Sequence, residues 1–236
     1  MMRHLCYRLT LAAVIAVLTS CQERMDIQGS TSIPELEERM AYLRVYKDGD
    51  MVAIDSARII HGKFHFTGPK QDTTVMASLF LGDESIMPVV VERDYPLTIV
   101  LDMNERRVKG SALNDSLFAF IKRKTAIDQQ LADFPHRESQ MILEGMEHDL
   151  IIEQLNQEAA VLGAQEDDLV MGFIKANMDN VLGPGVFMIV TSGLPYPILN
   201  PRIEELITLA SPYFLADPYV REYIRLAREN MEKMNE

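Results

Sequence analysis

The chain has 236 residues, of which 47% are hydrophobic and 25% are charged, and its formal net charge is −12. Without residues 1–20, which hold Arg3 and Arg8 and no acid, 23 − 2 = 21 cations face 35 acids, giving −14. Such a charge disfavours binding to nucleic acid and to anionic lipid headgroups. The remaining 216 residues suffice for one large domain or two small ones.

The N-terminus has the order of a secretory signal. Arg3, His4 and Arg8 precede an apolar run over residues 9–18, which is too short to span a bilayer. Leu18-Thr19-Ser20-Cys21 then resembles the lipobox of bacterial lipoproteins. We predict a signal peptide over 1–20, cleavage between Ser20 and Cys21, and lipidation of Cys21. The alternative is an ordinary cleaved signal in which Cys21 is incidental.

The lipobox also predicts a location. Acyl chains on Cys21 would tether the protein to a membrane, since each buried CH₂ contributes about 0.8 kcal/mol. By resemblance to Gram-negative sorting rules, Gln22 at the second position favours the outer membrane. We therefore expect a lipid-anchored cell-envelope protein, which could face the periplasm or the exterior.

Cysteine chemistry is excluded from the mature chain by the same prediction. Cys6 and Cys21 are the only cysteines in the sequence. Cys6 leaves with the signal peptide, and acylation consumes the thiol of Cys21. We expect no disulfide and no thiolate nucleophile in the mature protein.

The first half of the mature chain has the pattern of a β domain. Residues 21–34 could form a flexible tether or include a short first strand near Met25. Over residues 35–111, short alternating runs separated by turn signals such as Asp48-Gly49 and His61-Gly62 predict an antiparallel β-sandwich or barrel. The expected strands cover 42–46, 51–60, 63–66, 74–81, 87–92, 97–101 and 107–110.

The second half, residues 112–236, has helical periodicity. A first helix begins at Ser111 or Asn114, a second covers about 138–162 with Gly163 after its end, and a third begins at Glu166. Gly183-Pro184-Gly185 is expected to end the third. Residues 186–190 form a strand or a helical turn, and helices follow over about 201–210 and 218–233. The expected class is α+β, a β domain followed by an α-helical region.

The β half resembles a known family. Asp55-Ser56 followed by Gly62-Lys63-Phe64-x-Phe66-x-Gly68, together with Val108-Lys109-Gly110-Ser111-x-Leu113-Asn114, is similar to a domain of unknown function in Gram-negative envelope lipoproteins. In that family a thioredoxin-like or peroxiredoxin-type domain often follows. That domain and its redox cysteines have no counterpart here, so the resemblance implies the β fold and the lipoprotein context but no redox activity.

The sequence offers no catalytic constellation. His61 and His65 fall in a turn and a strand, Asp48 and Asp50 flank a turn glycine, and no Gly-x-Ser-x-Gly elbow is present. We predict no catalytic, cofactor-binding or metal-binding residue and no cofactor. The favoured function is a non-enzymatic interaction or scaffold module with an unidentified protein partner. The alternative is a shortened relative or accessory of a thioredoxin-like thiol-disulfide or peroxide system.

Overall fold

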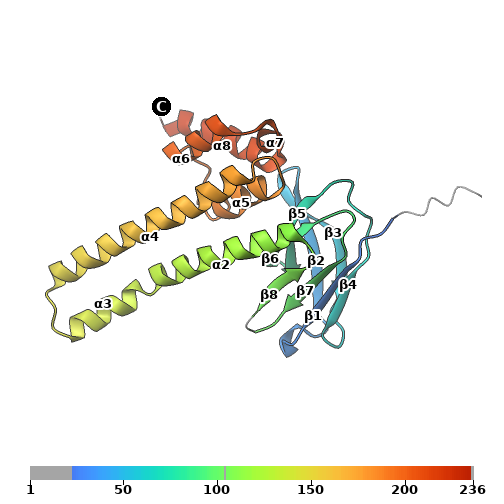
Figure 1. The fold of residues 1–236 in the computed structure, drawn as a ribbon, viewed down its shortest axis with the longest axis horizontal. Coiled ribbons are helices and arrows are strands. Elements are labelled where there is room, and N and C mark those ends of the chain that lie inside the picture. The colour runs from blue at the N-terminus through green and yellow to red at the C-terminus, as the bar shows by residue number, and fades with distance from the viewer. Residues whose placement is uncertain (1–22, 104, 235–236) are drawn as a thin grey trace, which may run out of the picture.

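The computed structural model describes residues 23–103 and 105–234, which form a β-sandwich followed by helices (Figure 1). The expected α+β class is confirmed. One sheet has the order β4-β1-β7-β8 and the other the order β3-β2-β5-β6. Two long helical segments project from one side of the sandwich, and shorter helices pack above it.

The first sheet contains the segment that was expected as a tether or a short strand. β1 (Ile27–Thr31) lies between β4 (Lys63–Phe66) and β7 (Leu97–Leu101), and β8 (Arg106–Lys109) completes the sheet. β1 pairs with β7 in parallel, whereas the other pairs in this sheet are antiparallel. The parallel pair departs from the purely antiparallel expectation, because β1 and β7 are far apart in sequence and no hairpin dictates their direction.

The second sheet is fully antiparallel and has longer strands. It consists of β2 (Met40–Lys47), β3 (Asp50–Arg58), β5 (Val75–Leu81) and β6 (Glu84–Val91). Its two hairpins are joined through the pairing of β2 with β5. Asp48 and Gly49 both have positive φ in the β2–β3 turn, as a tight hairpin requires. A 3₁₀ helix, η2 (Pro34–Leu36), connects β1 to β2.

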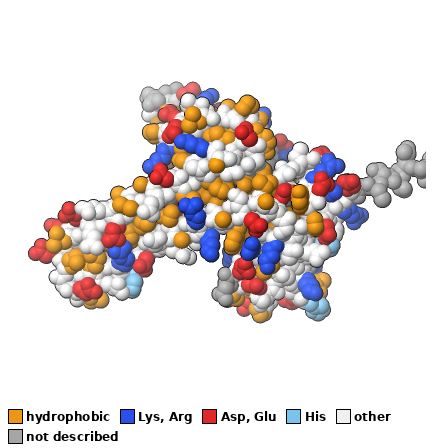
Figure 2. All heavy atoms as spheres, in the orientation of Figure 1, with side chains coloured by type: hydrophobic (Ala, Val, Ile, Leu, Met, Phe, Trp, Pro, Cys, Tyr) orange, Lys and Arg blue, Asp and Glu red, His pale blue; other side chains and the backbone are white. Residues whose placement is uncertain are grey.

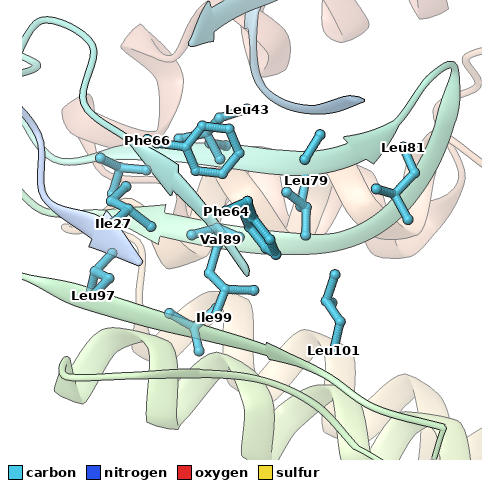
Figure 3. Packing of buried hydrophobic residues seen from close by; sticks show 14 of the residues in the cluster. Ile27, Leu43, Phe64, Phe66, Leu79, Leu81, Val89, Leu97, Ile99 and Leu101 are labelled. Atoms are coloured by element: carbon cyan, nitrogen blue, oxygen red, sulfur yellow. The ribbon is translucent and has the colours of Figure 1, made fainter. Parts of the chain in front are cut away.

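The sandwich core lies between the two sheets. Phe64 and Phe66 of β4 point toward Leu43 and Leu79 of the facing sheet (Figure 3). The Phe64 ring covers Gly29 on the neighbouring strand, where any Cβ would collide with it. Burial of this apolar surface is the main stabilising contribution to the sandwich.

The helical region begins with a long hairpin whose boundaries differ from the expected ones. α2 (Ala112–Ala132) and α3 (Phe134–Leu143) lead outward, and α4 (His148–Ala176) returns. The predicted helix over 138–162 is wrong, because the chain turns at residues 144–147, where Gly145 has φ +83°. Gly163 does not end a helix but lies inside α4.

Four further helices, together with the sandwich-side ends of α2 and α4, form a second core against the outer face of β5 and β6. The four are α5 (Leu182–Thr191), α6 (Pro201–Leu209), α7 (Pro212–Ala216) and α8 (Pro218–Met234). Gly183-Pro184-Gly185 does not terminate a helix, as was expected, but forms the first turn of α5. Proline is tolerated there because the first-turn N–H groups have no partner within the helix. Residues 186–190 are therefore helical.

Candidate functional site

The projecting helical hairpin is the most distinctive surface of the molecule. α4 has 29 residues and is therefore about 43 Å long. Arg137 of α3 bonds Glu158 of α4 at 2.6 Å, and Lys124 of α2 bonds Glu166 at 2.8 Å. The hydrogen bond raises the pKa of Arg137 and lowers that of Glu158. These ion pairs hold the outgoing and returning helices together along the hairpin.

The hairpin tip, which we define as residues 141–153, exposes apolar side chains. Leu143 is 87% exposed, Leu150 54% and Ile142 52%, and Met146 and Ile152 are also exposed. Only Ile151 within the tip is fully buried. Clustered exposed apolar side chains on a soluble fold commonly mark interaction surfaces.

Acidic side chains surround this apolar tip. Glu144, Glu147, Asp149 and Glu153 are all exposed within the same thirteen residues. Figure 2 shows acidic and hydrophobic side chains side by side at the far left, where α3 meets α4. A complementary surface would present an apolar groove bordered by Lys or Arg.

A second candidate surface is a cavity between the sandwich and the short helices. Its volume is about 410 Å³, which lies within the range of small-ligand pockets. Its walls come from β2, β5, α5, α7 and α8, and include Tyr46, Met76, Met188, Tyr213 and Tyr219. Tyr46 and Tyr219 pack edge to face with ring centroids 5.0 Å apart.

The polar groups of this cavity are mostly engaged in holding the helices. Asp217 Oδ1 accepts hydrogen bonds from the backbone N–H groups of Tyr219 and Val220, and so caps α8. Burial raises the pKa of Asp217 despite these bonds. The Tyr219 hydroxyl bonds Thr191 Oγ1 at 3.0 Å. The cavity therefore serves as a junction between the two parts of the protein.

The histidines and acids considered from the sequence are scattered. His61 has φ +51° in the β-turn, where the Glu37 carboxylate accepts the N–H groups of His61 and Gly62 and has a lowered pKa. His65 instead bonds Asp26 at 2.9 Å. Among residues 23–103 and 105–234, no group of three or more His, Cys, Asp or Glu side chains could hold a metal ion.

The predicted lipidation and cleavage residues, Cys21 and Ser20, lie outside the described residues. None of the helices in the described part of the chain is both long and apolar enough to cross a bilayer. The tip was missed from the sequence, because Leu143, Met146 and Leu150 were assigned to the buried stripe of a continuous helix. Gly145 was the signal that could have revealed the turn.

One known protein family matches the β half of the chain. Residues 25–117 match the model of a family described as a domain of unknown function, DUF4369. The match covers all eight strands and the first turn of α2, and it confirms the resemblance seen in the sequence. Searches of curated proteins and of solved structures gave no match for the chain.

Proposed function

We propose that the protein is an outer-membrane lipoprotein anchored by acyl chains on Cys21, and that its body is a non-enzymatic module that binds another protein. The leader and the Leu-Thr-Ser-Cys sequence support the anchor. The exposed apolar tip of the hairpin is the observation that carries the binding role. The DUF4369 match itself assigns no activity.

The chemistry of the tip indicates the kind of partner. Water-exposed Leu143 and Leu150 would gain free energy on burial, at roughly 25 cal/mol per Å² of apolar surface removed from water. The surrounding carboxylates repel an anionic bilayer and a second copy of the same acidic tip. A protein groove with an apolar floor and a basic rim therefore fits best.

The anchor is tested by Cys21→Ala in cells supplied with a fatty-acid probe. The wild-type protein should be labelled and should sediment with outer membranes, whereas the variant should be unlabelled and released. Retained labelling of the variant would contradict lipidation at this residue.

The binding role is tested by a photo-crosslinking amino acid placed at Leu143 in the intact lipoprotein. Leu209 of α6, which is 56% exposed and lies away from the tip, is the matched control position. We expect one discrete protein adduct at 143, none at 209, and loss of the adduct when Leu150→Glu is added. An adduct that is equal at both positions, or insensitive to Leu150→Glu, would contradict a specific tip contact.

A further inference from the structure

The described chain is bound into the sandwich from its first residue. The carbonyl of Glu23 accepts the backbone N–H of Lys70 at 3.0 Å, and the N–H of Met25 donates to the carbonyl of Gly68 at 2.9 Å. The side chains of Glu23 and Lys70 also form an ion pair at 3.2 Å. Met25 is only 5% exposed and belongs to the core. Glu23 is thus held in place by the fold.

This placement leaves very little chain for a spacer after the lipidated residue. Only Gln22 separates Cys21 from Glu23. Two peptide steps span at most about 7 Å, because each residue of a fully extended chain adds about 3.5 Å. If Cys21 carries acyl chains that insert into the bilayer, Cys21 itself lies at the level of the headgroups. Glu23 must then lie close to the headgroups as well.

The surface around Glu23 can be defined from its contacts. Lys70 bonds Asp94 at 3.1 Å as well as Glu23, and Arg93 lies 3.7 Å from Glu23. Tyr95, the next residue in the same loop, is 58% exposed. We call this surface, residues 23–24, 69–71 and 93–95, the anchor rim. A tyrosine suits a bilayer interface because its ring is apolar and its hydroxyl can remain hydrated.

The anchor rim and the hairpin tip lie at opposite ends of the molecule. In Figure 1 the start of the described chain is at the right of the sandwich, and the turn between α3 and α4 is at the far left. A membrane at the right-hand end would leave the hairpin directed away from it.

We propose that the anchor rim lies directly against the phospholipid headgroups, without a flexible spacer. The hairpin tip is then held at a fixed distance from the membrane surface. The inference rests on the proposed lipidation of Cys21. In this arrangement, the orientation of the protein body relative to the membrane follows from the hydrogen bonds that hold Glu23 and Met25 in the sandwich.

Contact at the rim arises from covalent proximity and does not need attraction to anionic lipid. The anchor rim holds three cations, Arg24, Lys70 and Arg93, and the last two already face the carboxylates of Glu23 and Asp94. Three cations against two carboxylates leave a net rim charge of only +1, and exposed ion pairs of this kind contribute little, so anionic headgroups gain little from the rim. Rim contact should therefore persist in vesicles of phosphatidylcholine alone.

The test uses the full acylated lipoprotein in phosphatidylcholine vesicles that contain a nitroxide-headgroup lipid. A fluorophore is attached through Tyr95→Cys or, as the matched control, through Leu143→Cys. Each site is exposed, and acylation leaves no other thiol in the mature chain. We expect the emission to be quenched at position 95 and unaffected at position 143.

A linker variant separates rim contact from anchoring. Sixteen Gly/Ser residues inserted between Gln22 and Glu23 would have a root-mean-square span of roughly 22 Å. We expect this protein to stay on the vesicles but to lose most quenching at position 95. The rim contact alone would be overturned if the labelled protein without the linker bound the vesicles but was not quenched at position 95. It would also be overturned if the quenching survived insertion of the linker. Failure of the acylated protein to bind vesicles would overturn the anchor as well.

Discussion

The side chain of Asn114 forms two hydrogen bonds with the backbone of Val90. Its Oδ1 accepts the Val90 N–H at 2.9 Å, and its Nδ2 donates to the Val90 carbonyl at 2.8 Å. Val90 lies in β6, an edge strand, and Asn114 lies in the first turn of α2. One amide group thus replaces the neighbouring strand that Val90 lacks, and it fixes the base of the helical hairpin on the sandwich.

Asn114→Ala should destabilise the protein by about 2–6 kcal/mol. The change leaves the buried N–H and carbonyl of Val90 without partners, and each unpaired group costs about 1–3 kcal/mol. Chemical denaturation measures the difference. Asn156→Ala, at an exposed position of α4, is the matched control and should change the free energy of unfolding little. Equal effects of the two substitutions would contradict this role for Asn114.

Gly183→Ala should destabilise the protein by about 1–3 kcal/mol, the usual range for an overpacked site. A Cβ at this position would collide with the backbone carbonyl of Asn177, which cannot move independently of its turn. Thermal unfolding should show a lowered midpoint. Gly193→Ala, where nothing lies within 4 Å of the added carbon, serves as the control.

Gly163→Ala should have the opposite effect. Gly163 lies inside α4, and an added Cβ meets nothing within 4 Å. Alanine is favoured over glycine in a helix interior by about 0.5–1 kcal/mol. A gain of this size in the free energy of unfolding is expected from denaturation curves. A loss would mean that the α4 helix is interrupted at residue 163, as the sequence pattern predicted.

Asp217→Asn should change how stability depends on pH. Burial raises the pKa of Asp217 in the folded protein above its ordinary value of 3.8. Between those two pKa values the folded state holds a proton that the unfolded state has lost, so the stability of the wild type falls as the pH rises through this window. Asparagine can also cap α8 but does not ionise.

The measurement for Asp217 is the free energy of unfolding across the acidic range. The variant should gain stability relative to the wild type as the pH rises from about 3.8, its unfolded-state pKa, and the difference should then level off. Asn156→Ala, an exposed change in α4 that removes no ionisable group, should show no such gain. A difference between Asp217→Asn and wild type that is constant with pH would contradict the burial of the Asp217 charge.

Local chemistry allowed several helix starts to be predicted. The side chains of Ser111 and Asn200 accept backbone N–H groups of the following turn, and proline follows Asn200 and Asp217 at the first helical position. Ser211-Pro212 has the same pattern and begins α7, a helix that was not predicted. These starts depend on residues that are adjacent in sequence, which is why the sequence reveals them.

The position of the turn in the helical hairpin of α3 and α4 could not be predicted in the same way. Gly145 and Gly163 are both glycines within a helical pattern, yet the first adopts a positive φ and turns the chain, while the second continues α4. The choice depends on α3 packing back against α4, a contact between segments that periodicity does not describe.

The sequence alone determined the α+β order, the β-turns at Asp48-Gly49 and His61-Gly62, and most helix caps, because each depends on interactions between near neighbours. Tertiary structure decided that β1 pairs with β7 in parallel, that Asn114 completes the edge at Val90, and that Leu143 is exposed at a tip. It also placed Glu23 in the sandwich. These features depend on contacts between residues distant in sequence, whose geometry is set only when the two sheets and the helices pack together.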